Sequence, residues 1–367
     1  MPPTISVVIP AYNVQFYIEQ CVQSVLAQLG EQHELVVVND GSTDATLAVL
    51  TRLQEAWPHA NFHVHTQANQ GIAATRNACI AAARGDYIAF LDSDDVLRAG
   101  SLHSLGDAIG AHRPDLIAFD FRMWHPNEPA KTHEIALHYP AGVLRDPQAL
   151  LTAFLANRHM YVWAHVIRRD IYAQLPMPIF PPGRVFEDVA TLPRLVSQCA
   201  SLLHVPHLIV DYRQHPTSIT QSISEAWCMD FVAALPVARL HLQRRGANAA
   251  VQRQFDMMIA HFYMSLVKSS YQLPHAVGQR TRARIKASFL ENMFGDYAGL
   301  VAAAGAGQLQ TKDRVQDQRM LAELKKVLSG DLLFHFRQAA SRKYKMWRQG
   351  RKLRRHLVTQ RGAQNKT

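Results

Sequence analysis

The sequence contains little cysteine and little charge, and it has no long uninterrupted apolar run. Its four cysteines are scattered singly, which argues against a zinc site built from CxxC pairs and against a disulfide-dense secreted fold. No segment offers the roughly 18 consecutive apolar residues of a membrane-spanning helix, and the N-terminal apolar stretch lacks the charged start of a signal peptide. From these features we expect a globular, cytoplasmic protein.

Acidic residues are missing from the end of the chain. From Arg337 onward there are eleven Lys or Arg residues and no Asp or Glu. Subtracting these eleven from the 39 basic residues of the chain leaves 28, against 29 acidic residues. The formal net charge of +10 is therefore carried by this tail, and the rest of the protein is nearly neutral.

The first hundred residues alternate strand and helix patterns. This alternation predicts an α/β fold with a mostly parallel, Rossmann-like sheet flanked by helices. Residues 5–9 predict the first strand, which Pro10 should end because it lacks a backbone N–H, and Asn13 can cap the next helix. The alanine-rich helix that starts near Ile72 is expected to end with Gly85 as its C′ residue.

The later part of the chain gives a different pattern. Residues 125–147 are rich in Pro and His and predict a loop, whereas residues 225–328 are helical in pattern throughout. A chain of 367 residues also exceeds the usual size of a single core. We therefore expect an α/β domain, a helical accessory region and a basic amphipathic tail, at residues 1–224, 225–330 and 331–367.

Polar segments follow three of the predicted strands: PAYN at 10–13, NDGSTD at 39–44 and DSDD at 92–95. Loops at the carboxyl ends of parallel strands converge on one crevice, so these segments are expected to meet there. Asp92 and Asp94 can share a hard cation such as Mn²⁺ or Mg²⁺, which would neutralise a diphosphate leaving group. The alternative for DSDD is an acidic turn exposed to solvent.

Further candidates lie on the same predicted crevice. Asp40 can accept hydrogen bonds from a base or ribose, although an Asx-turn is the usual role of Asp in an NDG sequence. Asn69, Gly71 and Arg76 lie at a helix start, where glycine permits close approach of an anion to the backbone. These residues are also compatible with an ordinary helix start.

Glu187 and Asp188 follow a segment rich in Pro and Gly, at the predicted start of a helix. A helix N-terminus favours acids in any protein, so the position alone does not indicate a site. The functional interpretation gives Asp188 the role of general base toward an acceptor hydroxyl. His215, which follows the strand ending at Tyr212, could complete a metal site or contact a diphosphate.

These segments together resemble glycosyltransferase family 2, an inverting group with the GT-A fold. The similar segments are SVVIPAYN, NDGSTD and NQGIAATRNACIAAARGDYIAFLDSDD. The resemblance implies a sugar-nucleotide site in which Asp94 ligates the metal and Asp92 either faces the ribose or shares the metal. The further donor contacts that it implies are Pro10, Tyr12, Asn13, Asp40, Asn69, Gly71, Arg76 and Ser93.

The resemblance is weaker in the second half. FEDV resembles the family's acidic motif, which implies Asp188 as base with Glu187 beside it, and YRQHPTSIT resembles a closing segment whose His215 contacts metal or diphosphate. WAHVIRRDIY departs from the family, because Ala164 and His165 stand where many relatives have Asn-Lys.

The activity implied is metal-dependent, inverting transfer of a hexosyl or N-acetylhexosaminyl group from a nucleotide-diphosphate sugar, with a UDP-sugar favoured. The acceptor would be a hydroxyl of a glycan or lipid-linked molecule in the synthesis of a bacterial surface polysaccharide. Inversion follows from a single base and direct displacement.

Two functions of other classes remain open from the residues. FLDSDDV also fits the nucleophile motif of a haloacid-dehalogenase-type phosphatase, although that motif normally opens its domain and here follows nearly ninety residues. A non-catalytic sugar-nucleotide-binding protein is the second. A nucleotidyltransferase would need a glycine-rich basic loop after the first strand, and PAYN is not such a loop.

Apolar residues recur at helical spacing in the basic tail, at Leu333, Phe336, Ala340, Tyr344 and Trp347. This composition suits an amphipathic helix that lies peripherally on the anionic inner face of a membrane. A solvated basic tail is the alternative. Nucleic acid is not an expected partner, because no RNA-reading motif accompanies the charge.

Overall fold

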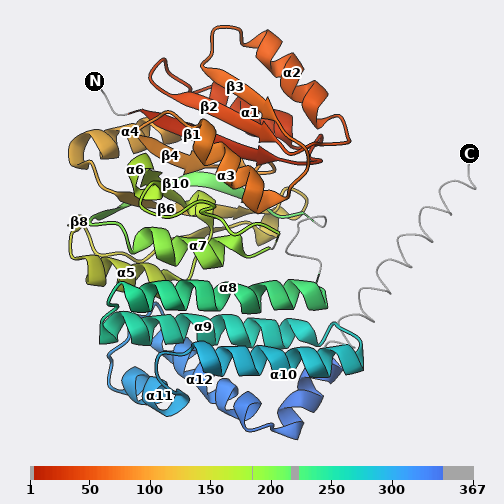
Figure 1. Ribbon diagram of the computed structural model, residues 1–367, viewed down its shortest axis with the longest axis vertical. Helices are drawn as coiled ribbons and strands as arrows, with labels where there is room; N and C mark the ends of the chain where they lie inside the picture. The colour runs from red at the N-terminus through yellow and green to blue at the C-terminus, as the bar shows by residue number, and fades with distance from the viewer. Residues whose placement is uncertain (1–3, 184, 216–222, 342–367) are drawn as a thin grey trace, which may run out of the picture.

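The structure is a computed structural model, and it describes residues 4–183, 185–215 and 223–341. Figure 1 shows a layered α/β part, coloured red to light green, and a set of helices stacked beneath it, coloured green to blue. This architecture confirms the predicted fold class, a mainly parallel sheet flanked by helices with a helical C-terminal region.

One mixed sheet runs through the α/β part in the strand order β3-β2-β1-β4-β9-β6-β10-β5, with β7 on β6 and β8 on β10. The strands of the sheet are β1 (Ile5–Ala11), β2 (Glu34–Asn39), β3 (Phe62–Thr66), β4 (Tyr87–Phe90), β5 (Val96–Leu97), β6 (Leu116–Trp124), β7 (His133–Ile135), β8 (Val143–Leu144), β9 (His165–Arg168) and β10 (Leu202–Arg213). β3, β2, β1 and β4 are mutually parallel, and so are β6 and β10. The antiparallel β9 joins these two groups because it pairs with both β4 and β6.

Seven α-helices and two short 3-10 helices belong to the α/β part as the structure describes it. They are α1 (Ile18–Leu26), α2 (Thr46–Ala56), α3 (Ile72–Ala82), α4 (Ser101–His112), α5 (Pro147–Asn157), α6 (Arg169–Tyr172), α7 (Glu187–Val196), η1 (Pro129–Lys131) and η2 (Val162–Ala164). α3 packs on β1 and β2, and α4 packs on β10. Strands buried on both faces require side chains that are apolar in succession, and all seven residues of β1 are buried.

The end of β1 differs from the prediction. The strand continues through Pro10 to Ala11, which pair with Val38 and Asn39 of β2. Val8, two residues before Pro10 on the same strand, accepts a hydrogen bond from Leu91, which follows β4. The N–H that Pro10 lacks would therefore also point toward the β4 side. β4 has already ended at that level, so the proline removes no ladder bond.

Gly85 has a different role from the predicted helix cap. α3 ends at Ala82, and Gly85 instead lies tightly against β1, where its N–H donates to Ser6 Oγ at 2.8 Å. A Cβ atom at this position would lie 2.7 Å from that oxygen. Glycine is required here for close approach of two backbones.

The predicted loop 125–147 contains regular structure. It holds η1 and the short strands β7 and β8, which pair with β6 and β10. Strands of two or three residues at a sheet margin carry too little periodic pattern to be recognised in a sequence.

The C-terminal helices agree with the helical pattern from residue 225 onward. They are α8 (Glu225–Arg244), α9 (Ala249–Ser270), α10 (His275–Asn292), α11 (Tyr297–Gly305) and α12 (Arg314–Leu328), and residues 332–341 are helical as well. α8, α9 and α10 lie side by side, and α8 and α9 pack on α7 and α5 of the α/β part. A single cluster of buried apolar residues extends from Ile5 to Phe334, so the two parts share a continuous core. None of the helices in the described ranges is both long and apolar enough to traverse a bilayer.

Replacement of Gly85 by Ala tests this packing. We expect Gly85→Ala to lower the free energy of unfolding by about 1–3 kcal/mol, because its Cβ would overlap the β1 backbone. Gly110→Ala is the matched control, since a Cβ there meets nothing within 4 Å inside α4 and should be neutral or stabilising. Urea unfolding measures both, and equal stability of the two variants would contradict the packing argument.

Candidate active site

A cavity of about 450 Å³ opens at the carboxyl ends of β1, β2 and β4. Most of the residues predicted for donor and metal binding line it: Pro10, Tyr12, Asn13, Asp40, Asn69, Gly71, Asp92, Ser93, Asp94 and His215. We call it the donor-side cavity. Of the predicted donor and metal residues only Arg76 is absent from its wall. The convergence of strand ends therefore gathers side chains that lie up to two hundred residues apart in the sequence.

Asp40 is fixed by the loop before α3. Its Oδ1 accepts from Gln67 Nε2 at 2.8 Å and from Gln70 N at 3.0 Å, and its Oδ2 accepts from Gly71 N at 2.8 Å. The Asx-type contact in this turn belongs to Asn39, whose Oδ1 accepts from Ser42 N. The buried Asp40 carboxylate is thus oriented by a neighbouring loop and not by its own turn.

Asn13 does not cap α1, which begins at Ile18 after Tyr17. It adopts a positive φ of 51°, and its Oδ1 accepts from Thr43 N at 2.8 Å. Its own N–H donates to Ser42 Oγ. The residue therefore ties the loop after β1 to the loop after β2, which fixes one wall of the donor-side cavity.

The acidic turn after β4 is held by the end of β10. Arg213 donates from its backbone N–H to Asp95 Oδ1 at 2.7 Å and from Nε to the Asp94 carbonyl at 2.6 Å. Its guanidinium also stacks over Trp124, 4.3 Å from the ring centroid. Burial, together with the charges of Asp94 and Asp92, raises the pKa of Asp95 well above its usual range. The charge of Arg213 partly offsets this crowding of acids.

Asp94 and His215 form the centre of the candidate metal site. Asp94 Oδ2 lies 2.7 Å from His215 Nε2, and the His215 ring packs against Tyr17. The third predicted ligand, Asp92, instead accepts from Arg76 at 3.1 Å. Within the described ranges, no three His, Cys, Asp or Glu side chains are grouped to hold a metal ion. The donor set of one carboxylate and one imidazole nevertheless fits a cation that takes its remaining ligands from a diphosphate and water.

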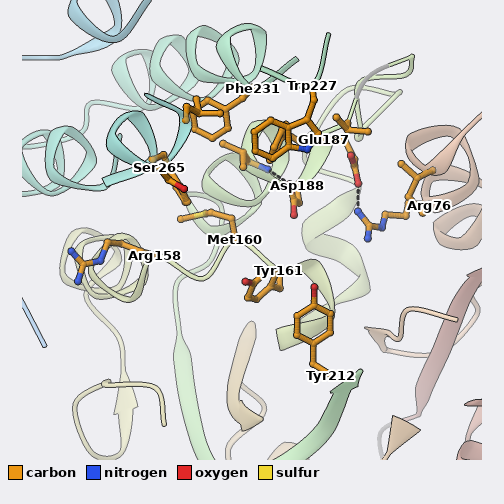
Figure 2. Close-up of a pocket in the computed structure, with 16 residues that line it drawn as sticks. Arg76, Arg158, Met160, Tyr161, Glu187, Asp188, Tyr212, Trp227, Phe231 and Ser265 are labelled. Atoms are coloured by element: carbon orange, nitrogen blue, oxygen red, sulfur yellow. Dashed lines mark hydrogen bonds and ion pairs between the residues drawn. The ribbon is translucent and has the colours of Figure 1, made fainter. Parts of the chain in front are cut away.

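A second cavity of about 350 Å³ adjoins the first, and Ile72 and Val185 line both. Figure 2 shows Asp188, Tyr161 and Tyr212 around its centre. Its outer wall comes from α8 and α9 and carries Trp227, Phe231, Phe262, Ser265 and Leu266. We call it the acceptor-side cavity. Asp40 and Asp94 therefore share one cavity, and Asp188 faces the neighbouring one.

Arg76 bridges the two cavities. Its terminal nitrogens donate to Asp92 of the acidic turn and to Glu187 at the start of α7. Figure 2 shows the contact with Glu187. The side chains of Arg76 and Glu187 are 7% and 6% exposed, so the pair is nearly desolvated. These contacts give both terminal nitrogens of Arg76 a carboxylate partner, and they hold Glu187 in an ion pair.

Asp188 is the carboxylate that faces the acceptor-side cavity. Its Oδ1 accepts from Val189 N at 2.7 Å, a backbone donor of the first turn of α7. Burial and the neighbouring charge of Glu187 raise the pKa of Asp188 to about 7. A carboxylate with this pKa is a stronger proton acceptor than an ordinary aspartate at neutral pH.

His165 lies away from both cavities. It is buried, its Nδ1 contacts the Tyr161 carbonyl at 2.9 Å, and burial lowers its pKa to about 4. At neutral pH it is therefore uncharged. Ala164 and His165 stand where many relatives have Asn-Lys, and they therefore supply no positive charge to the two cavities.

Several residues in and around the two cavities were missed in the sequence. Arg213 and Asp95 adjoin predicted residues, but only tertiary contacts give them a role. Tyr161 and Tyr212 stack with Trp163, a cluster spread over fifty residues of sequence. The aromatic residues that α8 and α9 contribute to the acceptor-side cavity have the helical spacing of ordinary core residues. The sequence therefore gives no signal that distinguishes them from core residues. None of the residues lining the two cavities comes from the predicted loop 125–147.

Comparison with known sequences gives a consistent family assignment. The sequence profile described as Glycosyl transferase family 2 matches residues 6–174. The chain is 42% identical over 259 residues to EpsH of Bacillus subtilis (strain 168), named as a glycosyltransferase, and the match covers 70% of this chain and 74% of EpsH. Three other curated relatives are matched over 64%, 33% and 37% of their own length, so the chain spans less than two thirds of each.

Two solved structures have similar folds. S. aureus TarS 1-349 in complex with UDP-GlcNAc has a TM-score of 0.69 at 18% identity, over 95% of this chain and 92% of that chain. The mannosyltransferase PcManGT from Pyrobaculum calidifontis in complex with GDP-Man and Mn²⁺ has a TM-score of 0.51 at 15% identity, over 90% and 88%. At these identities the likeness concerns the fold.

The ion pair between Arg76 and Glu187 yields a stability prediction. We expect Arg76→Met to lower the free energy of unfolding by about 3–5 kcal/mol, because it leaves Glu187 buried without its partner. Adding Glu187→Gln should restore part of this loss by removing the unpaired charge. Denaturant unfolding of the single and double variants measures the coupling.

The matched control is Arg52→Met, because the ion pair of Arg52 with Glu19 is exposed on both sides. That variant should change the free energy of unfolding by less than about 1 kcal/mol. Strictly additive losses in the Arg76 and Glu187 variants would show that the two side chains do not depend on each other.

Proposed function

Because this chain belongs to glycosyltransferase family 2, we propose that it transfers a sugar from a nucleotide-diphosphate sugar to an acceptor hydroxyl. A UDP-sugar is the favoured donor, and a hexosyl or N-acetylhexosaminyl group is the favoured transferred group. The acceptor is a glycan or a lipid-linked molecule in the synthesis of a surface polysaccharide. Family membership removes the haloacid-dehalogenase-type phosphatase from consideration.

One observation carries this proposal. A cavity lined by strand-end acids adjoins a second cavity lined by a single available carboxylate, and the two meet at Ile72 and Val185. Transfer requires a donor and an acceptor held next to each other, with a base on the acceptor side. We therefore propose that the donor binds beside Asp40 and the acceptor beside Asp188.

The donor-side cavity supports binding of a nucleoside diphosphate. Tyr12 is 46% exposed and offers an aromatic face to a base, and the fixed Asp40 carboxylate offers acceptors to a base or ribose. The similarity in fold to TarS, which was solved with UDP-GlcNAc, supports uracil as the base. Gly71 has a positive φ of 83° at the start of α3, so its backbone can approach a phosphate closely.

Mn²⁺ or Mg²⁺ is the proposed cofactor. Asp94 and His215 are the residues that would hold it, with Asp92 close behind and tied to Arg76. When bound, such a cation neutralises charge that builds on the departing diphosphate. The similarity in fold to PcManGT, solved with GDP-Man and Mn²⁺, supports this choice.

Asp188 is the proposed general base. It takes the proton of the acceptor hydroxyl as the hydroxyl oxygen attacks the anomeric carbon of the donor. The attack forms one glycosidic bond while the bond to the diphosphate breaks, so the configuration inverts. Glu187 is bound to Arg76 and is unsuited to act as a second, nucleophilic carboxylate, which supports direct displacement.

The domain division at residues 1–224, 225–330 and 331–367 remains a proposal, as does peripheral contact with the inner face of a membrane through the tail. Most of that tail, including Tyr344 and Trp347, lies outside the described residues. In the described part, Leu333 and Phe336 are exposed, which supports an interfacial role.

Metal and donor binding are tested together on Asp94. We expect UDP with Mn²⁺ to raise the Tm of the protein, and Asp94→Ala to abolish the part of the shift that depends on metal. Asp107→Asn, a change of an exposed acid on α4, is the control and should keep the full shift. An unchanged metal-dependent shift in Asp94→Ala would exclude Asp94 as a ligand.

The base is tested on Asp188. We expect Asp188→Asn to retain the donor-induced Tm shift and to lower turnover by about 10²–10⁴, because the amide cannot accept the proton. The pKa of about 7 also sets a pH dependence in the parent protein. Below this pH Asp188 is protonated and cannot act as base, so kcat/KM should fall about tenfold per pH unit as the pH drops.

Transfer is measured with a panel of UDP-sugars, and the stereochemistry of the product is determined by NMR. Turnover in Asp188→Asn close to that of the parent would remove this residue from its proposed role. A product of retained configuration would contradict direct displacement.

A further inference from the structure

A third cavity lies in the helical region, away from the two cavities already described. It has a volume of about 660 Å³ and is formed by α9, α10, α12 and the helical residues 332–341. Its floor and rim include Val267, Leu273, Val327, Leu332 and Phe336, which are apolar. None of its lining residues belongs to the donor-side or acceptor-side cavity.

Two cations line this cavity without a carboxylate partner among the described residues. Arg282 stacks on Tyr271, 4.2 Å from the ring centroid, and donates to Ser270 Oγ at 3.3 Å. Lys286, one helical turn later on α10, donates to the Leu328 carbonyl at 2.7 Å. Burial lowers the pKa of Arg282, as expected for a partly desolvated cation whose charge is not balanced nearby.

The opposite arrangement occurs on another face of the same helix. Arg280 and Arg284 are also four residues apart, and both pair with Glu225 at the start of α8. α10 therefore carries one basic pair that shares a carboxylate partner and one pair that faces a cavity. An external anion that binds the second pair, Arg282 and Lys286, has no carboxylate of the described residues to displace.

The rim of the cavity is apolar and exposed. Leu332 and Phe336 on the rim are 85% and 71% exposed, and Leu333, which follows Leu332 without lining the cavity, is 56% exposed. They are three of the twelve large apolar side chains exposed among the described residues. Leu332 and Phe336 are one helical turn apart and both line the cavity. Chain residues 342–367 follow directly, with ten Lys or Arg and no acid in the sequence.

We propose that this cavity binds the headgroup of an anionic phospholipid, so that the helical region docks on a membrane surface through Arg282, Lys286 and the apolar rim. The paired cations meet the phosphate, and Leu332, Leu333 and Phe336 enter the adjacent apolar layer. A phospholipid has the matching arrangement, because its charged headgroup lies next to its apolar chains. The proposal does not depend on the transfer reaction.

Other occupants fit the cavity less well. The basic segment 342–367 of the same chain would place like charges against Arg282 and Lys286, which is unfavourable. A soluble phosphate or a nucleic acid would satisfy the cations and leave the apolar rim in water. An anionic amphipathic surface satisfies both features.

The test is co-sedimentation of the full-length protein with vesicles of phosphatidylcholine, with and without phosphatidylglycerol. We expect binding only to the anionic vesicles. Each basic residue near such a surface contributes about 1 kcal/mol, or roughly fivefold in affinity. Arg282→Gln with Lys286→Gln should therefore weaken binding roughly 25-fold.

The matched control is Arg280→Gln with Arg284→Gln, which removes the same charge from the same helix outside the cavity. It should change vesicle affinity by less than about twofold, because both side chains are occupied by Glu225. Leu332→Ser with Phe336→Ser should also weaken binding, and both changes lie outside the buried core. Thermal unfolding and donor binding serve to show that all variants are folded.

The contribution of the tail is separated by a full-length variant with Arg351, Lys352, Arg354 and Arg355 changed to Gln. The loss caused by the cavity variant should persist in this background. Equal losses in the Arg282/Lys286 and Arg280/Arg284 variants would mean that only net charge matters, and would overturn the proposal. Equal binding of an RNA oligonucleotide would overturn it as well.

Discussion

Compensation of crowded carboxylates by two buried arginines is the interaction on which the rest of the site depends. The strand ends gather acids because parallel strands finish at one edge of the sheet, and such a group is unstable unless cations lie among its members. Arg76 binds Asp92 and Glu187, and Arg213 binds the turn around Asp94 and Asp95. Asp40, Asp94 and Asp188 make no ion pair with either arginine, and all three line the cavities.

This compensation also divides the carboxylates by role. Glu187 and Asp188 are neighbours at the start of α7, yet Glu187 is held by Arg76 while Asp188 faces the acceptor-side cavity. The close charge of Glu187 adds to burial in raising the pKa of Asp188. The pair thus consists of one carboxylate held in an ion pair and one, the proposed base, that faces the acceptor-side cavity. Arg76 connects the first of these, Glu187, to the donor-side turn through a buried bridge.

The helical region is part of the site and not only an attachment to it. α8 and α9 supply the outer wall of the acceptor-side cavity, and they share a continuous core with the sheet. A change in these helices therefore alters the space offered to an acceptor without changing the donor-side loops. The same region carries the cavity beside α10, so one set of helices would place the acceptor-side cavity near a membrane surface.

The sequence by itself determined the α/β fold, the helical region from residue 225 onward and most of the polar residues that line the donor-side cavity. Each could be predicted because it depends on local signals in the sequence: apolar periodicity, turn residues, and acids placed directly after strands. The tertiary structure alone decided the partners of Arg76, the role of Arg213, the aromatic wall from α8 and α9, and the short strands within 125–147. These depend on contacts between segments far apart in the chain, and such contacts leave no periodic pattern along it. The roles of Pro10 and Gly85 could not be predicted from the sequence for the same reason, because each depends on the strand that lies beside the residue.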